Sequence, residues 1–422
     1  MKVVWLSNTP CSASEKLLPD YPSGGWLTTL EKSLSAIESI ELHVLFYHND
    51  KIDPFKINRT YFHPILRRKG RTKLQRLIKK YFNVINNEQQ ELKELRERIN
   101  SLNPEIVHVH GTEDNFGLIV EKVEVPIVIS IQGITNSIVE KFHSGISFEI
   151  AAKFESTKDV ILKKSARDIY LMFEVMAKRE QRILRNSKFV IGRTEFDRRI
   201  SRLLSPESSY FVGQELIREV FHQNQWNKSS FGSKIKLVSI SGDQVYKGFE
   251  SIIRTAEILS KHSNLEFEWN VIGLKESDSI VRLCRRWLIK DFNNINLTLM
   301  GLKNENELVN IMIASDIYCQ VSHIENSPNS LCEAMMLGLP CIANFAGGTS
   351  SILEDGKEGV LVQEGDPFSM AGAIVEMVSD FEKAKQLGSN ARARALKRHN
   401  KEQVVNDLLE TYRQVIASNF SE

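Results

Sequence analysis

Short apolar runs alternate with amphipathic stretches along this chain, and the alternation begins twice. The first series has apolar runs at Val3–Leu6 and Leu42–Tyr47, with an amphipathic stretch at Trp26–Ser39 between them. Two further runs, Ile106–His110 and Ile127–Ile131, each come soon after a proline. Strands that alternate with helices are typical of βαβ units, so this half predicts a parallel, doubly wound sheet.

The second series starts after a polar connector at residues 214–233, and we place the boundary near residues 210–231. Its apolar runs are Ile235–Ile240, Phe267–Ile272, Leu297–Met300, Ile317–Val321, Cys341–Ala343 and Val360–Val362. A chain of 422 residues exceeds what one hydrophobic core usually supports. The sequence therefore predicts an α/β protein with two Rossmann-like domains, divided between residues 212 and 213.

The cysteines and the first residues indicate a cellular compartment. The five cysteines are widely spaced, with no CxxC pair and no histidine at zinc spacing, so we expect a reduced, cytoplasmic chain. The start of the chain is typical of a strand rather than of a signal peptide, and we expect no membrane span. The formal charge of +2 leaves the class of partner open.

The loop after Ile317–Val321 is where we expect chemistry, because ligands of open α/β sheets bind beyond the carboxyl ends of the strands. Ser327 and Pro328 predict a helix start, with serine as the N-cap and proline at the first helical position, and Gly338 predicts its end. Such a helix start can bind a diphosphate without a divalent metal. The amides left without helical partners are those of Asn329, Ser330 and Leu331.

Two carboxylates accompany this helix start. Glu325 precedes the helix and Glu333 lies within it, so one side chain can face a sugar and the other a ribose. The alternative is that both acids only follow the preference of acidic residues for the first turn of a helix. The proline, the glycine stop and the preceding strand favour the binding site.

These glutamates, together with the segment SPNSLCEAMMLGLPCIANFAGG, resemble the family-4 glycosyltransferases. The resemblance implies a GT-B fold, in which two Rossmann-like, doubly wound domains face each other across a cleft. It makes residues 1–212 the acceptor-side domain with helical insertions, residues 213–400 the donor nucleotide-sugar domain, and residues 401–422 a helix that crosses back. It also implies retaining, metal-independent transfer.

The resemblance assigns roles in the second half. Glu325 would contact donor-sugar hydroxyls near the reacting carbon, Glu333 would hold the ribose, and Lys247 in the segment Tyr246-Lys247-Gly248 would neutralise the donor phosphates. An arginine common in the family a few residues upstream is absent here. Arg193 is our candidate for that part of the phosphate clamp.

In the first half, Gly24 and Gly25 lie between a strand and a helix, and the resemblance places them against the donor diphosphate. A plain glycine turn is the alternative. His110 resembles the family histidine that polarises an acceptor hydroxyl. Gln132 stands on the acceptor side where the family frequently has histidine, and glutamine cannot act as a base. The departing phosphate oxygen would then take the acceptor proton.

Residues 65–82 carry eight basic side chains and no acidic one, and their apolar residues fall at helical spacing. A basic amphipathic helix suits the surface of an anionic membrane. The alternative is a solvated helix that packs on the domain through its apolar strip. Nucleic acid is not expected, because no aromatic stacking array accompanies the basic residues.

The predicted function is that of a retaining hexosyltransferase-like glycosyltransferase, without a cofactor, in cell-surface polysaccharide biosynthesis. It would move a sugar from a UDP- or GDP-sugar to a glycan or lipid-linked acceptor, in the cytoplasm or at the inner face of the membrane. The sugar, the base and the acceptor stay open. A sugar-nucleotide epimerase of the same fold and a catalytically silent scaffold subunit are the alternatives.

Overall fold

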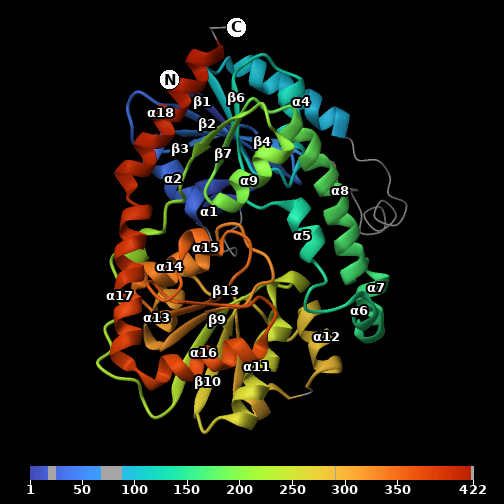
Figure 1. Ribbon diagram of the computed structural model, residues 1–422. Helices are drawn as coiled ribbons and strands as arrows, with labels where there is room; N and C mark the ends of the chain where they lie inside the picture. Colours follow the sequence, from blue (N-terminus) through green and yellow to red (C-terminus); the bar gives the residue numbers. More distant parts are fainter. Residues whose placement is uncertain (18–24, 68–87, 290, 420–422) are drawn as a thin grey trace. The chain divides into compact units, whose positions relative to one another are not determined.

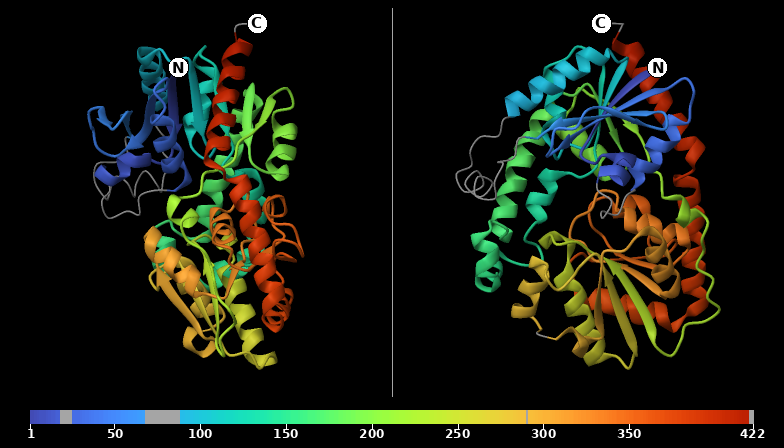
Figure 2. Two further views of the ribbon diagram at one scale, coloured as in Figure 1. Left: turned by 90° about the vertical axis from the view of Figure 1, so that its left-hand side faces the viewer. Right: turned by 180° about the vertical axis from the view of Figure 1, so that it is seen from behind.

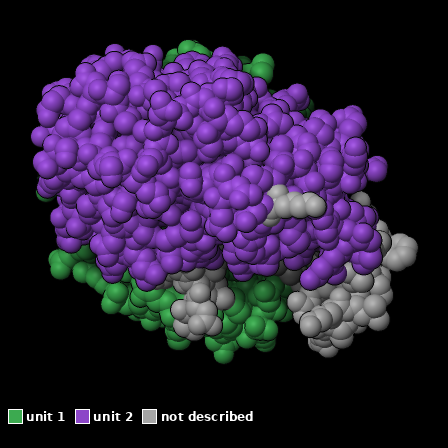
Figure 3. Space-filling view, turned by 90° about the horizontal axis from the view of Figure 1, so that it is seen from below, with its two compact units in different colours: residues 1–136, 173–216, 399–422 green, residues 137–172, 217–398 purple. Residues whose placement is uncertain are grey.

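The computed structural model describes residues 1–17, 25–67, 88–289 and 291–419, and it has two compact units (Figures 1 and 3). Unit 1 contains residues 1–136, 173–216 and 399–422, and unit 2 contains residues 137–172 and 217–398. Segment 137–172 thus groups with the second half of the chain, whereas the sequence places it in the first domain. The predicted division of the chain into two domains between residues 212 and 213 stays a prediction.

Unit 1 is built on an eight-stranded sheet with the order β3-β4-β2-β1-β5-β6-β7-β8. Every pairing is parallel except that of β3 with β4. The order reverses at β1, so the sheet is doubly wound as predicted. Its strands are β1 (Lys2–Ser7), β2 (Glu41–His48), β3 (Phe55–Ile57), β4 (Thr60–Leu66), β5 (Ile106–His110), β6 (Ile127–Ser130), β7 (Phe189–Gly192) and β8 (Ser209–Val212).

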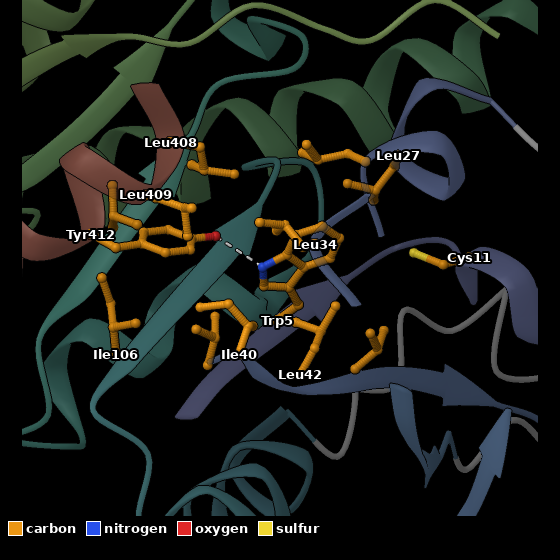
Figure 4. Close-up of a cluster of buried hydrophobic side chains, with 14 of the residues drawn as sticks. Trp5, Cys11, Leu27, Leu34, Ile40, Leu42, Ile106, Leu408, Leu409 and Tyr412 are labelled. Carbon is orange, nitrogen blue, oxygen red and sulfur yellow. Dashed lines mark hydrogen bonds between the residues drawn. The ribbon is translucent and has the colours of Figure 1, made fainter. Parts of the chain in front are cut away.

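The first strand and the last helix of the chain both contribute side chains to the core of unit 1. Val3, Val4, Trp5 and Leu6 of β1 are all fully buried, as expected for a central parallel strand covered on both faces. The indole nitrogen of Trp5 donates a hydrogen bond of 2.9 Å to the hydroxyl of Tyr412 (Figure 4). Tyr412 lies on the last helix, α18 (Lys401–Asn419), which runs alongside the sheet of unit 1 (Figures 1 and 2).

One helix of the first half is shorter than the sequence predicts, since the expected helix at 26–39 ends at Ser35. The helical part of residues 148–185 consists of three helices, α6 to α8. Helices α5 and α8 each pass from one unit to the other. The helices are α1 (Ser14–Leu17), α2 (Trp26–Ser35), α4 (Glu88–Leu102), α5 (Thr135–Lys141), α6 (Phe148–Phe154), α7 (Thr157–Ile161), α8 (Ala166–Arg185) and α9 (Glu195–Leu204).

Unit 2 is built on a six-stranded parallel sheet with the order β11-β10-β9-β12-β13-β14. All six predicted runs form strands, which are β9 (Ile235–Ile240), β10 (Phe267–Ile272), β11 (Leu297–Gly301), β12 (Ile317–Gln320), β13 (Cys341–Asn344) and β14 (Val360–Val362). Its further helices are α10 (Glu219–His222), α11 (Phe249–His262), α12 (Ser279–Trp287), α13 (Glu305–Ala314), α14 (Asn329–Leu337), α15 (Thr349–Ile352), α16 (Pro367–Ser379) and α17 (Phe381–Arg398).

The structure bears on the predictions about the cysteines, membrane spans and the basic segment. All five cysteines are buried, and no disulfide joins any of them in the described parts of the chain. Among the residues that the structure describes, no helix combines the length and the apolar character needed to cross a membrane. Most of the basic segment at 65–82 lies outside the described residues, so its contact with a membrane stays a prediction.

Candidate functional site

Two loops of unit 2 meet beyond the carboxyl ends of β9 and β12, which are neighbours in the sheet. Gly248 follows β9 and has φ +73°, and a Cβ placed on it would come 2.2 Å from the carbonyl oxygen of Val321, just after β12. Only glycine fits this conformation and this approach without strain. The backbone amide of His323 also donates to the carbonyl of Tyr246 at 2.9 Å. The loops are therefore joined through their backbones.

Lys247 and Glu325 form an ion pair between these loops. The ammonium nitrogen of Lys247 lies 2.7 Å from Oε1 of Glu325, and their side chains are 27% and 13% exposed. Burial works against the charge of Lys247, but the charges of Glu325 and Tyr246 and the hydrogen bond to Glu325 together outweigh burial and raise the pKa of Lys247. The structure thus brings together two residues that the sequence singled out separately, whereas their catalytic roles stay predictions.

Helix α14 begins one residue later than predicted. Pro328 is the N-cap, with ψ 108°, and Asn329 is the first helical residue, so the assignment of Ser327 as N-cap is wrong. The physical reason is that the extended ψ of Pro328 turns its carbonyl toward the helix. That carbonyl accepts hydrogen bonds from the amides of Leu331 at 3.0 Å and Cys332 at 3.2 Å.

The later start changes which amides can bind an anion. The amide of Leu331 is not available as predicted, because it donates to Pro328. The amides of Asn329 and Ser330 donate to no other group in the described part of the chain. The side-chain oxygen of Asn329 is also buried without a hydrogen bond among these residues. Two amides, rather than three, remain at the positive end of the helix dipole.

Glu333 is buried on α14 and is held by an arginine. The guanidinium of Arg218 donates to Oε1 of Glu333 from Nε at 3.0 Å and from Nη2 at 2.6 Å. Neither bond uses Oε2, and no other described residue donates to that oxygen. Burial raises the pKa of Glu333, and the charge of Arg218 partly offsets this. The ribose role of Glu333 stays a prediction, and Oε2 is the atom open to it.

The sequence did not point to Arg218. It lies in the polar connector at the N-cap of α10, and it is 115 positions from Glu333 in the chain. The one signal available was indirect: a carboxylate on a helix as apolar as α14 needs a buried cation as its partner.

His110 is enclosed in unit 1, at the end of β5. Its ring centroid is 3.8 Å from that of His108 and 4.4 Å from that of Trp5, and the residue is 1% exposed. Neither ring nitrogen has a hydrogen bond to a described residue. Burial, followed by the charges of His108 and Arg193, holds the pKa of His110 well below its usual range, so the ring is neutral. Its role toward an acceptor stays a prediction.

The other predicted residues of the first half lie in separate places of unit 1. Arg193 follows β7, where its Nε is 3.6 Å from Oε2 of Glu215 and its guanidinium lies over the ring of Trp26 at 4.2 Å. Gly25 has φ +96° and is the N-cap of α2. Gln132 is half-buried after β6. Gly24 lies outside the described residues, and the phosphate and acceptor roles of all four stay predictions.

Comparison with known proteins gives a match in the second half of the chain. Residues 221–394 match the sequence profile of a family described as "Glycosyl transferases group 1". The chain is similar to N-acetyl-alpha-D-glucosaminyl L-malate synthase of Bacillus anthracis, with 26% identity over 31% of this chain and 34% of that protein. It is also similar to UDP-Gal:alpha-D-GlcNAc-diphosphoundecaprenol alpha-1,3-galactosyltransferase of Escherichia coli, with 31% identity over 21% and 22%. These matches span about a third or less of the relatives' length.

Solved structures resemble the whole chain. Sucrose-phosphate synthase from Thermosynechococcus elongatus superposes with a TM-score of 0.72 and 17% identity, over 99% of this chain and 100% of that one. Anabaena HepE in complex with UDP and glucose has a TM-score of 0.61 and 14% identity, over 97% and 99%. At these identities the likeness concerns the fold alone. The predicted resemblance to GT-B glycosyltransferases is confirmed, with two parallel-sheet domains.

Proposed function

We propose that this chain, which resembles GT-B glycosyltransferases, is a retaining glycosyltransferase that takes a sugar from a nucleoside diphosphate. The observation that carries the proposal is the arrangement at the carboxyl ends of β9 and β12. There an ammonium group, a carboxylate and two amides of a helix start come from adjacent loops of one unit. A diphosphate ester of a sugar needs cations and donors for its phosphates and an acceptor for its hydroxyls.

Each group has a role in the proposed reaction. The amides of Asn329 and Ser330 bind the diphosphate, and Lys247 stabilises the negative charge that develops on it as the bond to the sugar breaks. Glu325 accepts hydrogen bonds from the sugar hydroxyls near the reacting carbon, and Oε2 of Glu333 accepts them from the ribose. These donors replace the divalent metal that other sites use to neutralise phosphates, so we propose that the reaction needs none.

We also propose the nucleotide of the donor and the class of the acceptor. UDP is our first candidate nucleotide, since HepE, which shares the fold, was solved in complex with UDP. The name of the E. coli relative describes transfer to a diphosphoundecaprenol-linked sugar, which supports a glycan or lipid-linked acceptor in polysaccharide synthesis. Such an acceptor would bring the enzyme to the inner face of the membrane, where residues 65–82 would contact anionic lipids.

Calorimetric titration with UDP, GDP and ADP, each with and without EDTA, tests the donor site. We expect one nucleotide to bind, with the same affinity in EDTA. Replacing Glu325 with glutamine keeps the size of the side chain, and it should leave nucleotide binding measurable while transfer from the matching nucleotide sugars falls about 100-fold or more. Unchanged transfer by this variant would contradict the assignment. Nucleotide binding without transfer in the wild type would favour the scaffold alternative, and formation of an epimer would favour the epimerase.

A further inference from the structure

His323 lies two positions before Glu325, and its side chain has no exposed surface. Its Nε2 is 2.5 Å from Oε1 of Glu250, and its Nδ1 forms a second close contact with Oε1 of Glu364. A neutral imidazole can donate from only one nitrogen, and an ionised carboxylate only accepts. Two carboxylate partners therefore require an imidazolium.

The charges around His323 agree with this state. Burial opposes the charged ring, but the hydrogen bonds that the ring donates to Glu250 and Glu364, together with the charges of these two carboxylates, outweigh burial and raise the pKa of His323 to about 9. The bond to His323 lowers the pKa of Glu364, which also lies 3.0 Å from the ammonium of Lys141 on α5. Cys284 on α12 faces Glu250, and burial followed by that charge raises the pKa of the thiol, which keeps it neutral.

The backbone at Gly145 packs closely against the ion pair of His323 and Glu250. Gly145 comes from segment 137–172, and a Cβ placed on it would lie 1.8 Å from Oε1 of Glu250 and 2.2 Å from Nε2 of His323. Any larger residue would have to displace the ion pair. Water is thus excluded from the ring, and the bonds of His323 are made in a dry environment, where they constrain its position strongly.

The cluster adjoins the pair of Lys247 and Glu325. Glu250 stands in the first turn of α11, three positions after Lys247, and His323 stands two positions before Glu325. The bond of His323 to Glu250 therefore joins the same two loops as the bond of Lys247 to Glu325. If the ring loses a proton, one of the two carboxylates loses one of its donors. Loss of the proton on Nε2 removes the bond to Glu250, which is one of the contacts between the two loops.

We infer that His323, as an imidazolium between Glu250 and Glu364, is a positioning residue that keeps Glu325 within reach of Lys247. The inference rests on the proposed function, in which those two groups act on the donor. It deepens that function, because it makes the donor half of the site depend on one buried proton.

The test couples a spectroscopic titration to activity. NMR of the protein labelled with ¹³C and ¹⁵N in its histidines reports the midpoint of His323 and shows whether both ring nitrogens carry protons at pH 7. The pH profile of kcat/KM for transfer, or of UDP affinity, is recorded on the same samples. We expect the profile to fall about tenfold per pH unit above the NMR midpoint, as a single titrating group does.

Replacing Glu364 with glutamine supplies the decisive comparison. It removes one charged acceptor, so the midpoint of His323 and the alkaline limb of activity should move to lower pH by the same amount. The matched control is Glu376→Gln, which changes an exposed glutamate 3.0 Å from Lys383, and neither quantity should move. A midpoint that moves without the activity limb, or a ring that is neutral at pH 7, would overturn the inference.

A second measurement separates this inference from the proposed function. Crystal structures of the wild type and of His323→Gln report the distance between Nζ of Lys247 and Oε1 of Glu325, which is 2.7 Å here. We expect this pair to separate in the variant, with or without nucleotide. An unchanged pair would refute the positioning role even if the protein binds no nucleotide, and absence of nucleotide binding in the wild type would refute the proposed function alone.

Discussion

Replacing Arg218 with methionine would remove the guanidinium that holds Glu333 while keeping a side chain of similar length. Glu333 is 9% exposed and Arg218 is 17% exposed, so their pair is nearly buried. Removing one partner of a buried ion pair costs about 3 to 5 kcal/mol, because the other charge is left without compensation. The partial exposure of Arg218 places the expected loss near the lower end, at about 3 kcal/mol.

The loss should depend on pH, with a sign that follows from the pKa of Glu333. Burial already raises this pKa in the wild type, and removing Arg218 takes away the charge that opposes the rise. An acid whose pKa is higher in the folded than in the unfolded protein destabilises the fold as pH rises through the interval between the two values. The variant should therefore lose less stability at pH 4 than at pH 8.

Urea denaturation at both pH values measures the change in unfolding free energy. Lys383→Met is the matched control, because it breaks an exposed pair with Glu376, and exposed pairs contribute little to stability. The double variant Arg218→Met with Glu333→Gln should recover much of the loss, since no uncompensated charge remains. An equal loss at the two pH values, or no recovery in the double variant, would refute the reasoning.

Three further predictions concern stability. Gly248→Ala should lower the unfolding free energy by about 2 kcal/mol or more in urea denaturation, because φ is +73° and a backbone oxygen occupies the space of the new methyl group. A variant as stable as the wild type would contradict this. Tyr412→Phe should lower the unfolding free energy by about 1 to 3 kcal/mol in the same measurement, because the indole of Trp5 loses its buried acceptor. A decrease smaller than the experimental error would contradict a contribution of that bond to stability. The stabilisation that His323 contributes should be complete below pH 6.5 and disappear as pH rises through about 9, since its pKa is raised in the fold. Denaturation of the wild type and of His323→Phe across this interval checks it, and parallel curves would exclude the effect.

Much of the fold follows from local patterns. The strand Cys341–Asn344 lies between the stop Gly338-Leu339-Pro340 and a glycine turn, and such punctuation locates a buried strand without knowledge of its neighbours. Glu325 could be singled out because it follows a strand of a parallel sheet, whereas Lys247 was singled out by the family resemblance of its segment. Strands that lie side by side bring their following loops together, so the contact between the two residues follows from the topology.

Other features needed the folded chain. The first residue of α14 depends on the ψ of Pro328, and a proline in the sequence restricts φ but leaves ψ open. The partner of Glu333 depends on which side chain the connector brings to α14, and burial demands a cation without specifying its position in the chain.

The sequence by itself determined the two open parallel sheets and the loops that carry the candidate donor site, because hydrophobic periodicity and turn residues act over a few neighbouring positions. Only the tertiary structure decided that Arg218 pairs with Glu333, that two amides of α14 remain available, and that Glu250, Glu364 and Gly145 enclose His323. These contacts join residues far apart in the chain, and their geometry depends on packing, which no local pattern encodes.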